Sequence, residues 1–447
     1  MLKNILKYGG IEAVAKGLNR ALILLLPLFL PVSEFGTIGL LVASELIFPM
    51  FSMLGFDRAI LRFYHEKEKY ENFLETIISS VIALQVLIFF VLIVFKLIGV
   101  NELFGIPIFP NFFILHFNIS IINLMQLLLN IQRTSEKHKN YLKLKVVFQI
   151  LKFIIVIGLA LLLKNNLSYL LGVFFALIIT VLININEFKS LINFRFNSKT
   201  FKFLILFCWP FVFHTIANNL LGNVDRFIFE KYLTLEDVGI YTFGFSVASS
   251  LSFAFQGANV YLEPQIYKAK SADDKTKKLR YYIYFTLICG CFGFIMLNLF
   301  AEYVILEYFQ KYSSSLSIIP IIAIAHIFLP FYYSSNYSLV AEKKTFSVAK
   351  VSIISAIMNV AFILLFLQYM GYESGAFAFF SSMLFLAFTI TVIAKFKGQE
   401  IIILCSVISI ITLLLVFINQ IILYILFTIL LGLYSFFKLK RISIESE

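Results

Sequence analysis

Three charged side chains, Glu12, Lys16 and Arg20, lie within the apolar stretch 9–31, which has the length of a transmembrane helix. Their spacing of four residues places them on one helix face, with Asn19 beside them. The opposite face can then meet lipid while this stripe faces protein or water. A charge at the bilayer centre costs about 2.5–3.5 kcal/mol or more, so the stripe is a candidate site for charge pairing or for binding a polar ligand.

A structural explanation remains open for two of the three charges. Glu12 and Lys16 could pair on the helix surface, and Lys16 could extend towards the headgroups. Arg20 lies about 11 residues, or roughly 16 Å, into a hydrocarbon layer about 30 Å thick. From that depth the Arg20 side chain cannot easily extend to the headgroups. Arg20 is therefore the principal candidate for a functional charge on this stripe.

Two more charges are predicted to lie deep in the membrane. Glu45, in the predicted span 35–56, is about 15 Å from the outer surface, the depth that Arg20 reaches from the inside. A pair between Arg20 and Glu45 is the favoured interpretation, and an unpaired Glu45 would instead be a candidate proton carrier. Lys152, in the predicted span 144–163, is a further candidate for coupling or charge pairing.

The seventh predicted span, 203–225, and the residue after it carry two polar stripes. One consists of His214, Asn218 and Asp225, and the other of Asn219, Asn223 and Arg226. Amides between membrane helices can act as hydrogen-bonding glue or can line a cavity, and so dense a cluster favours a water-filled cavity. Asp225 and Arg226, near the outer end of this span, are predicted to form a salt bridge or an interface anchor.

The composition predicts an all-α polytopic membrane protein. Of 447 residues, 60% are hydrophobic and 14% charged, with a mean hydropathy of +0.92. A soluble fold of this size has too little interior for so many apolar side chains. The first apolar segment lacks the pattern of a cleaved signal peptide and is predicted to be retained. Nucleotide-binding loops and metalloprotease motifs do not occur, so neither a cofactor nor an enzymatic activity is predicted.

Hydropathy predicts fourteen spans, of which the last two could be a tight hairpin. They are 9–31, 35–56, 73–98, 110–132, 144–163, 167–187, 203–225, 238–262, 281–305, 316–340, 347–369, 374–395, 401–418 and 420–437. We predict two six-helix lobes and an extra helix pair. The predicted divisions are an N-terminal lobe (1–190), a linker (191–202), a C-terminal lobe (203–397), the extra pair (398–437) and a tail (438–447).

The net charge of +12 reports membrane topology. Of the 37 lysines and arginines, 29 fall on one side of the predicted spans and five on the other. By the positive-inside rule, both termini are predicted to be cytoplasmic. The basic loops are then solvated faces, and no nucleic-acid partner is predicted.

An internal repeat supports the two lobes. A shift of about 203 residues lays VSEFGTIG (32–39) on LEDVGIYT (235–242) and matches Gly36 with Gly239. Because an even number of spans separates the two turns, the lobes are predicted to have parallel orientation.

Three segments carry a family resemblance: PVSEFGTIGLL (31–41), LGFDRAILRFY (54–64) and NVDRFIFEKYLTLEDVGIYTFGFSVAS (223–249). They resemble the Wzx-type flippases, the polysaccharide-transporter branch of the multidrug/oligosaccharidyl-lipid/polysaccharide exporter superfamily. The resemblance implies two six-helix lobes around a central cavity. It also implies a bacterial cytoplasmic-membrane protein that moves an undecaprenyl-diphosphate-linked oligosaccharide to the outer leaflet, for O-antigen, capsule or exopolysaccharide synthesis. Many members have 12 helices, so the extra pair departs from the pattern.

The resemblance gives the polar residues expected roles. Arg20, aided by Lys16, would bind the diphosphate, and the amides would bind sugar hydroxyls. The remaining substrate-binding candidates are Asn19, His214, Asn218, Asn219 and Asn223. The lobes would rock in alternating access, and other glycan-assembly proteins in the bilayer could be partners.

Two other classes of function remain open. A cation-coupled multidrug exporter of the same superfamily would favour an anionic cavity, which Lys16 and Arg20 argue against. A membrane-embedded glycan polymerase or ligase would favour a long outside loop, and no predicted outside loop exceeds about 15 residues.

Overall fold

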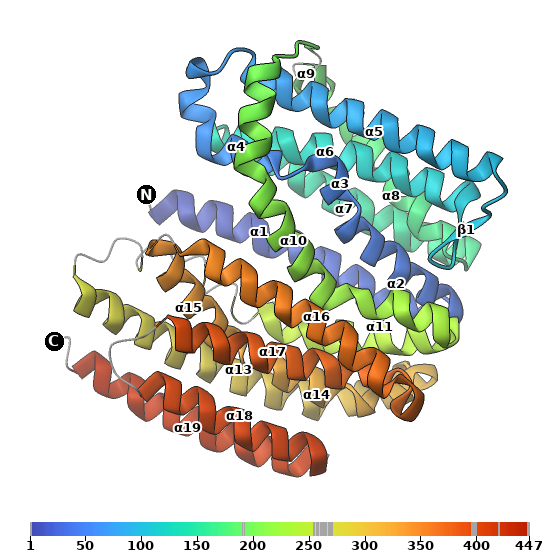
Figure 1. The fold of residues 1–447 in the computed structure, drawn as a ribbon. Coiled ribbons are helices and arrows are strands. Elements are labelled where there is room, and N and C mark those ends of the chain that lie inside the picture. Colours follow the sequence, from blue (N-terminus) through green and yellow to red (C-terminus); the bar gives the residue numbers. More distant parts are fainter. Residues whose placement is uncertain are drawn as a thin grey trace. The chain divides into compact units, whose positions relative to one another are not determined.

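A computed structural model describes most of the chain (Figure 1). It covers residues 2–189, 191, 193–253, 255, 259, 266, 271–342, 344–394, 400–418 and 421–444. Nearly all described residues are helical, and the one described sheet is a pair of two-residue strands. The all-α prediction is confirmed.

The helices form two compact units. One comprises Leu6–Gly239, and the other comprises Ile240–Glu447 together with Met1–Ile5. We call them the N-terminal and C-terminal units. Helix α10, which begins within the predicted linker 191–202, packs within the N-terminal unit. The division into two six-helix lobes and an extra pair stays a prediction.

The N-terminal unit contains α1 to α10 and a small hairpin. Its elements are α1 (Leu2–Leu25), η1 (Leu26–Leu28), α2 (Val32–Ile47), α3 (Pro49–Met53), α4 (Phe56–Phe63), η2 (Tyr64–Lys69), α5 (Phe73–Leu97), β1 (Glu102–Leu103), β2 (Ile106–Pro107), η3 (Ile108–Phe112), α6 (Phe113–Thr134), α7 (His138–Leu163), α8 (Leu167–Ile183), α9 (Ile185–Lys189) and α10 (Ser198–Tyr232). The predicted span 35–56 is interrupted because Pro49 cannot donate a backbone hydrogen bond. Leu54 and Gly55 then adopt left-handed backbone conformations that turn the chain into α4.

The C-terminal unit begins within α11 (Leu235–Ser249). Its other elements are η4 (Ser250–Ser252), α13 (Ala272–Tyr308), η5 (Gln310–Ser317), α14 (Ile319–His326), α15 (Leu329–Ala341), α16 (Thr345–Met370), α17 (Glu373–Ile393), α18 (Glu400–Ile418) and α19 (Ile421–Ile444). Helix α19 packs along α13, and α18 contacts α17, so the extra pair belongs to this unit (Figure 1). The predicted hairpin residues 419–420 lie outside the described residues.

Eight described helices are long and apolar enough to cross a membrane. A ninth appears if the bent pair Gln310–Ser317 and Ile319–Val340 is one span. Two further apolar helices, Leu167–Ile183 and Glu400–Val416, are too short to be included. The count of fourteen therefore stays a prediction.

The surface of α5 is typical of a helix against lipid. Val86, Phe90 and Val94, spaced by four residues, are about half exposed, whereas Val81 is buried on the unit's interior. Contiguous exposed apolar side chains of this kind are rare in water and normal in a bilayer.

A buried polar network holds α3, α5 and α6 together. The Ser52 hydroxyl accepts hydrogen bonds from the amides of Gln85 and Asn123, each at 2.8 Å. The Ser120 hydroxyl donates to the side-chain oxygen Oε1 of Gln85 at 2.8 Å. These bonds satisfy amides that would otherwise be costly in an apolar interior, so this network is structural.

The first turns of α2 and α11 approach closely through two glycines. A Cβ added at Gly36 would lie 2.0 Å from the carbonyl oxygen of Leu235, and one added at Gly239 would lie 2.2 Å from that of Val32. The shift that matches Gly36 with Gly239 also matches Val32 with Leu235. The contact is therefore reciprocal, as expected for two turns related by a local two-fold axis.

Replacing Gly36 with Ala should destabilise the protein. The added methyl would overlap a backbone carbonyl, which cannot rotate away, and overpacking of this kind costs about 1–3 kcal/mol. Thermal unfolding in detergent should show a lower midpoint than wild type. The control is Gly158→Ala in α7, where nothing lies within 4 Å of the new methyl and where Ala should raise stability slightly. Equal midpoints for the two variants would contradict the close approach.

Candidate functional site

A chain of hydrogen bonds links four helices of the N-terminal unit. The Lys152 ammonium on α7 donates to Asn19 Oδ1 on α1 at 3.1 Å and to the Tyr169 hydroxyl on α8 at 3.2 Å. Tyr169 in turn donates to Glu45 Oε2 on α2 at 2.7 Å. We call Lys152, Tyr169 and Glu45 the buried relay; Asn19, which is exposed, lies at one end of it.

Charge balance explains why the buried relay can exist in an apolar interior. Lys152 is 7% exposed and Tyr169 only 1%. The Lys152 ammonium lies 5.1 Å from the centre of the Tyr169 ring and within electrostatic reach of Glu45. An ammonium and a carboxylate joined through a hydroxyl offset each other's desolvation. One acceptor remains open, because Glu45 Oε1 is buried without a hydrogen-bond partner among the described residues.

The structure gives Glu45 a different partner from the one expected. Its carboxylate accepts from Tyr169 and is balanced by Lys152, whereas the sequence favoured a pair with Arg20. Lys152 was a charge-pair candidate, but Tyr169 was missed. The only sequence signal for Tyr169 was indirect, since a lysine in an apolar helix needs a hydrogen-bond acceptor nearby. In the structure α7 packs on α8, and Tyr169 of α8 is that acceptor.

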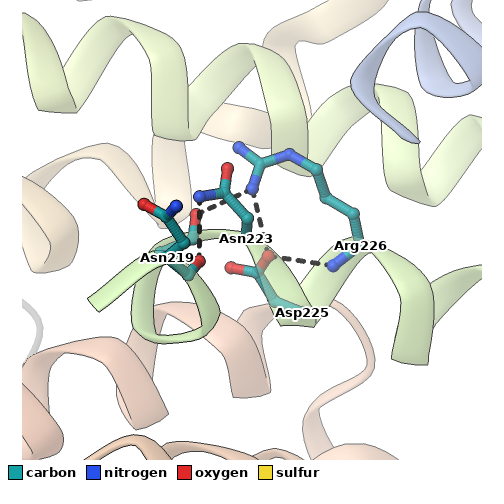
Figure 2. A network of polar contacts seen from close by, with 5 residues as sticks. Asn219, Asn223, Asp225 and Arg226 are labelled. Carbon is teal, nitrogen blue, oxygen red and sulfur yellow. Dashed lines mark hydrogen bonds and ion pairs between the residues drawn. The ribbon is translucent and has the colours of Figure 1, made fainter. Parts of the chain in front are cut away.

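A second polar cluster lies on α10 (Figure 2). Arg226 Nη1 lies 3.1 Å from Asp225 Oδ1 and donates to the Gly222 carbonyl at 2.9 Å. Asp225 Oδ1 also accepts from the Arg226 backbone N–H. The predicted salt bridge is therefore present in the structure, and both of its side chains are buried.

One amide of α10 reaches a neighbouring helix. The Asn219 amide donates to the Leu46 carbonyl on α2 at 2.8 Å, next to Glu45. The Asn223 amide instead donates to the Asn219 carbonyl on its own helix at 3.0 Å (Figure 2). Asn219 thus joins α10 to α2 through an interhelical hydrogen bond, whereas Asn223 bonds within α10.

Replacing Asn219 with Leu should lower stability by about 0.6–2 kcal/mol, the range for one interhelical hydrogen bond in a membrane protein. The Leu46 carbonyl lies close to the break at Pro49, where the helix offers fewer alternative donors. Thermal unfolding in detergent measures the loss. Asn223→Leu, one turn away, removes only a bond within α10 and should cost less; the reverse order would contradict the assignment.

Arg20, on the α1 stripe, lies within electrostatic range of Arg226 in the α10 cluster. Arg20 is half-buried, and the positive charge of Arg226 acts on it. Lys16 and Asn19 are exposed, and Asn218 on α10 is half-buried. The structure thus brings cations from two helices into one region of the N-terminal unit.

Two sequence candidates have undescribed side chains. Glu12 and His214 lie in the described helices α1 and α10, but the positions of their side chains fall outside the described part. Their predicted roles stay predictions. Among the described residues, no group of three His, Cys, Asp or Glu side chains could hold a metal ion.

The site as a whole is cationic. Its two described carboxylates, Glu45 and Asp225, each lie beside a cation, Lys152 and Arg226 respectively. Arg20 and Lys16 add positive charge on α1. Such a region suits an anionic group better than an organic cation.

These features describe a helical protein with several candidate membrane spans and a cationic polar region in its N-terminal unit. The family described as "Polysaccharide biosynthesis protein" matches residues 1–260, more than half of the chain. The chain belongs to this family. No curated protein sequence matches it.

Solved structures share the fold at low sequence identity. The chain resembles "Lipid II flippase MurJ, inward closed conformation" with a TM-score of 0.71 and 16% identity, over 97% of this chain and 98% of that one. It resembles an inward-facing multidrug resistance MATE family transporter of the MOP superfamily with a TM-score of 0.60 and 12% identity, over 87% and 95%. A MOP superfamily transporter from Pyrococcus furiosus aligns with a TM-score of 0.53 and 13% identity, over 91% and 96%.

These similarities confirm the family and the fold that the three segments indicated. The protein has the fold of a MOP superfamily transporter and belongs to a polysaccharide biosynthesis family. At these identities the solved structures speak for the fold alone.

Proposed function

We propose that this protein is a flippase for a lipid-linked oligosaccharide in the bacterial cytoplasmic membrane. It moves an undecaprenyl-diphosphate-linked glycan from the inner to the outer leaflet by alternating access, with both of its own termini in the cytoplasm. The observation that carries the proposal is the cationic region formed by Lys16 and Arg20 on α1 and Arg226 on α10.

The chemistry of the region suits the two polar parts of such a substrate. A guanidinium can hold two phosphate oxygens at once, and charge-assisted bonds of this kind are stronger than neutral ones. Arg20 is the principal diphosphate contact, because it lies deep and already within the field of Arg226. Asn19 and Asn218 offer neutral amides for sugar hydroxyls.

The relatives support the same class of substrate. The family is described by polysaccharide biosynthesis, and MurJ is described as a lipid II flippase. A glycan on a lipid carrier needs a route for its polar part, which polar side chains within membrane helices provide.

A cation-coupled multidrug exporter is the second candidate, because MATE transporters share the fold. The open oxygen Glu45 Oε1 is the one observation that favours it, since a buried carboxylate could carry a proton or cation. Against it, Lys152 already balances Glu45 and Arg226 already balances Asp225. A glycan polymerase or ligase has no specific observation in its favour.

Deletion of the gene tests the proposal. The deletion strain should lose surface glycan and accumulate the lipid-linked oligosaccharide on the cytoplasmic side, and the wild-type gene should restore export. Unchanged surface glycan together with increased sensitivity to organic cations would instead support the exporter.

A further inference from the structure

A cavity of about 160 Å³ lies in the N-terminal unit, away from the polar region just described. It is enclosed by the start of α5, the end of α6 and the segment around α9, which lies at the opposite end of the unit from β1 (Figure 1). The positive-inside rule predicts that this end faces the cytoplasm. The cavity therefore lies near the level of the inner-leaflet headgroups.

An unsatisfied amide oxygen lines this cavity. Gln132 on α6 is only 1% exposed, and its amide nitrogen donates to Glu187 Oε2 at 3.4 Å. Its oxygen, Oε1, is buried and has no hydrogen-bond partner in the described part of the chain. A buried acceptor without a donor is costly, so a donor that enters the cavity would gain this hydrogen bond.

Two carboxylates add negative charge beside that oxygen. Glu187 on α9 is oriented by Gln132 and by the amide of Asn140. Glu75 on α5 also lines the cavity, and its carboxylate makes no hydrogen bond or ion pair with the described residues. Three acceptors therefore line one small space.

The remaining lining determines what kind of donor fits. Leu74 and Leu128 provide apolar walls, and Lys137 places a cation at the same cavity. A primary ammonium has three N–H donors, which match three acceptors, and an alkyl stem that can pack on leucine. The cavity volume of about 160 Å³ is well above the roughly 10–15 Å³ that a single water requires, so the cavity has room for a larger group.

We propose that this cavity binds a primary alkylammonium group. Glu75 and Glu187 balance its charge, and Gln132 Oε1 accepts its third hydrogen bond. The group has two possible sources, the ethanolamine headgroup of an inner-leaflet phospholipid and a free diamine. In the lipid, Lys137 would contact the phosphate.

Binding by the full-length, delipidated protein distinguishes these sources. Nanodiscs of phosphatidylethanolamine are compared with nanodiscs of phosphatidylcholine, whose quaternary ammonium has no N–H donor. Putrescine is titrated separately in detergent, with thermal unfolding as the readout. A lipid source predicts a higher unfolding midpoint in phosphatidylethanolamine, and a free amine predicts saturable stabilisation by putrescine without a lipid preference.

Three variants assign the effect to the cavity. Glu75→Gln should weaken amine or lipid binding about tenfold or more, because it removes a charge partner. Gln132→Leu should also weaken binding, and it serves as the second test if Glu75→Gln folds poorly. Glu68→Gln removes an exposed carboxylate outside the cavity and should leave binding unchanged. The proposal is overturned if wild type shows neither a lipid preference nor saturable amine binding, or if both cavity variants bind like wild type.

Discussion

Arg20→Ala should abolish export of surface glycan while the protein stays at its normal level in the membrane. Each hydrogen bond to a charged group is worth about 1.5–3 kcal/mol, and 1.4 kcal/mol corresponds to tenfold. Loss of two such bonds to a diphosphate should therefore reduce translocation by about 100-fold or more. Surface glycan measured with a labelled lectin, alongside immunoblots of the membrane fraction, checks this result.

Two further arginine variants sharpen that test. Arg20→Lys keeps the charge but loses the two-point hold, so it should export at an intermediate level. Arg133→Ala, on the exposed end of α6, removes an arginine outside the site and should export normally. Normal export by Arg20→Ala at normal protein level would show that Arg20 does not bind the substrate.

Lys152→Met should destabilise the protein strongly, more than Gly36→Ala or Asn219→Leu. It removes the cation of the buried relay and leaves the Glu45 carboxylate in an apolar interior. Breaking a buried pair in this way costs about 3–5 kcal/mol. Thermal unfolding in detergent, or the yield of folded protein, should fall accordingly, whereas Lys139→Met, exposed on the same helix, should have little effect.

Adding Glu45→Gln to Lys152→Met should restore most of the lost stability. Lys152→Met with Glu45→Gln removes both charges, so no uncompensated ion remains, and the double variant should be more stable than either single variant. The interaction energy follows from the double-mutant cycle. Strictly additive losses would show that Lys152 and Glu45 do not balance one another.

The fold was largely predictable because hydropathy repeats along the chain. The long apolar segment 73–98 predicted α5 closely, and 144–163 predicted the end of α7, which begins six residues earlier at His138. Interruptions within spans were not predicted. Proline is tolerated inside membrane helices when neighbours satisfy the freed groups, so Pro49 and the break between α14 and α15 left the hydropathy signal intact.

Contacts between helices were harder to predict than contacts along one helix. Asp225 and Arg226 are neighbours in sequence, and their salt bridge was anticipated. Arg20 and Glu45 were paired on depth alone, which fixes one coordinate and leaves the position around the helix bundle open. The structure instead joins Glu45 to Tyr169 and Lys152.

The internal repeat shows what an alignment can and cannot predict. It matched Gly36 with Gly239 as equivalent positions. That the two turns meet reciprocally, each glycine beside a carbonyl of the other turn, required the structure.

Translocation in proteoliposomes tests the central claim most directly. Purified protein is reconstituted with an undecaprenyl-diphosphate-linked oligosaccharide, and movement across the bilayer is followed by a lectin or glycosidase that reaches only one face. Wild type should expose the glycan much faster than empty liposomes, and Arg20→Ala should match the empty liposomes. No acceleration by wild type, in vesicles where the same preparation exchanges an organic cation along a proton or sodium gradient, would contradict the flippase assignment.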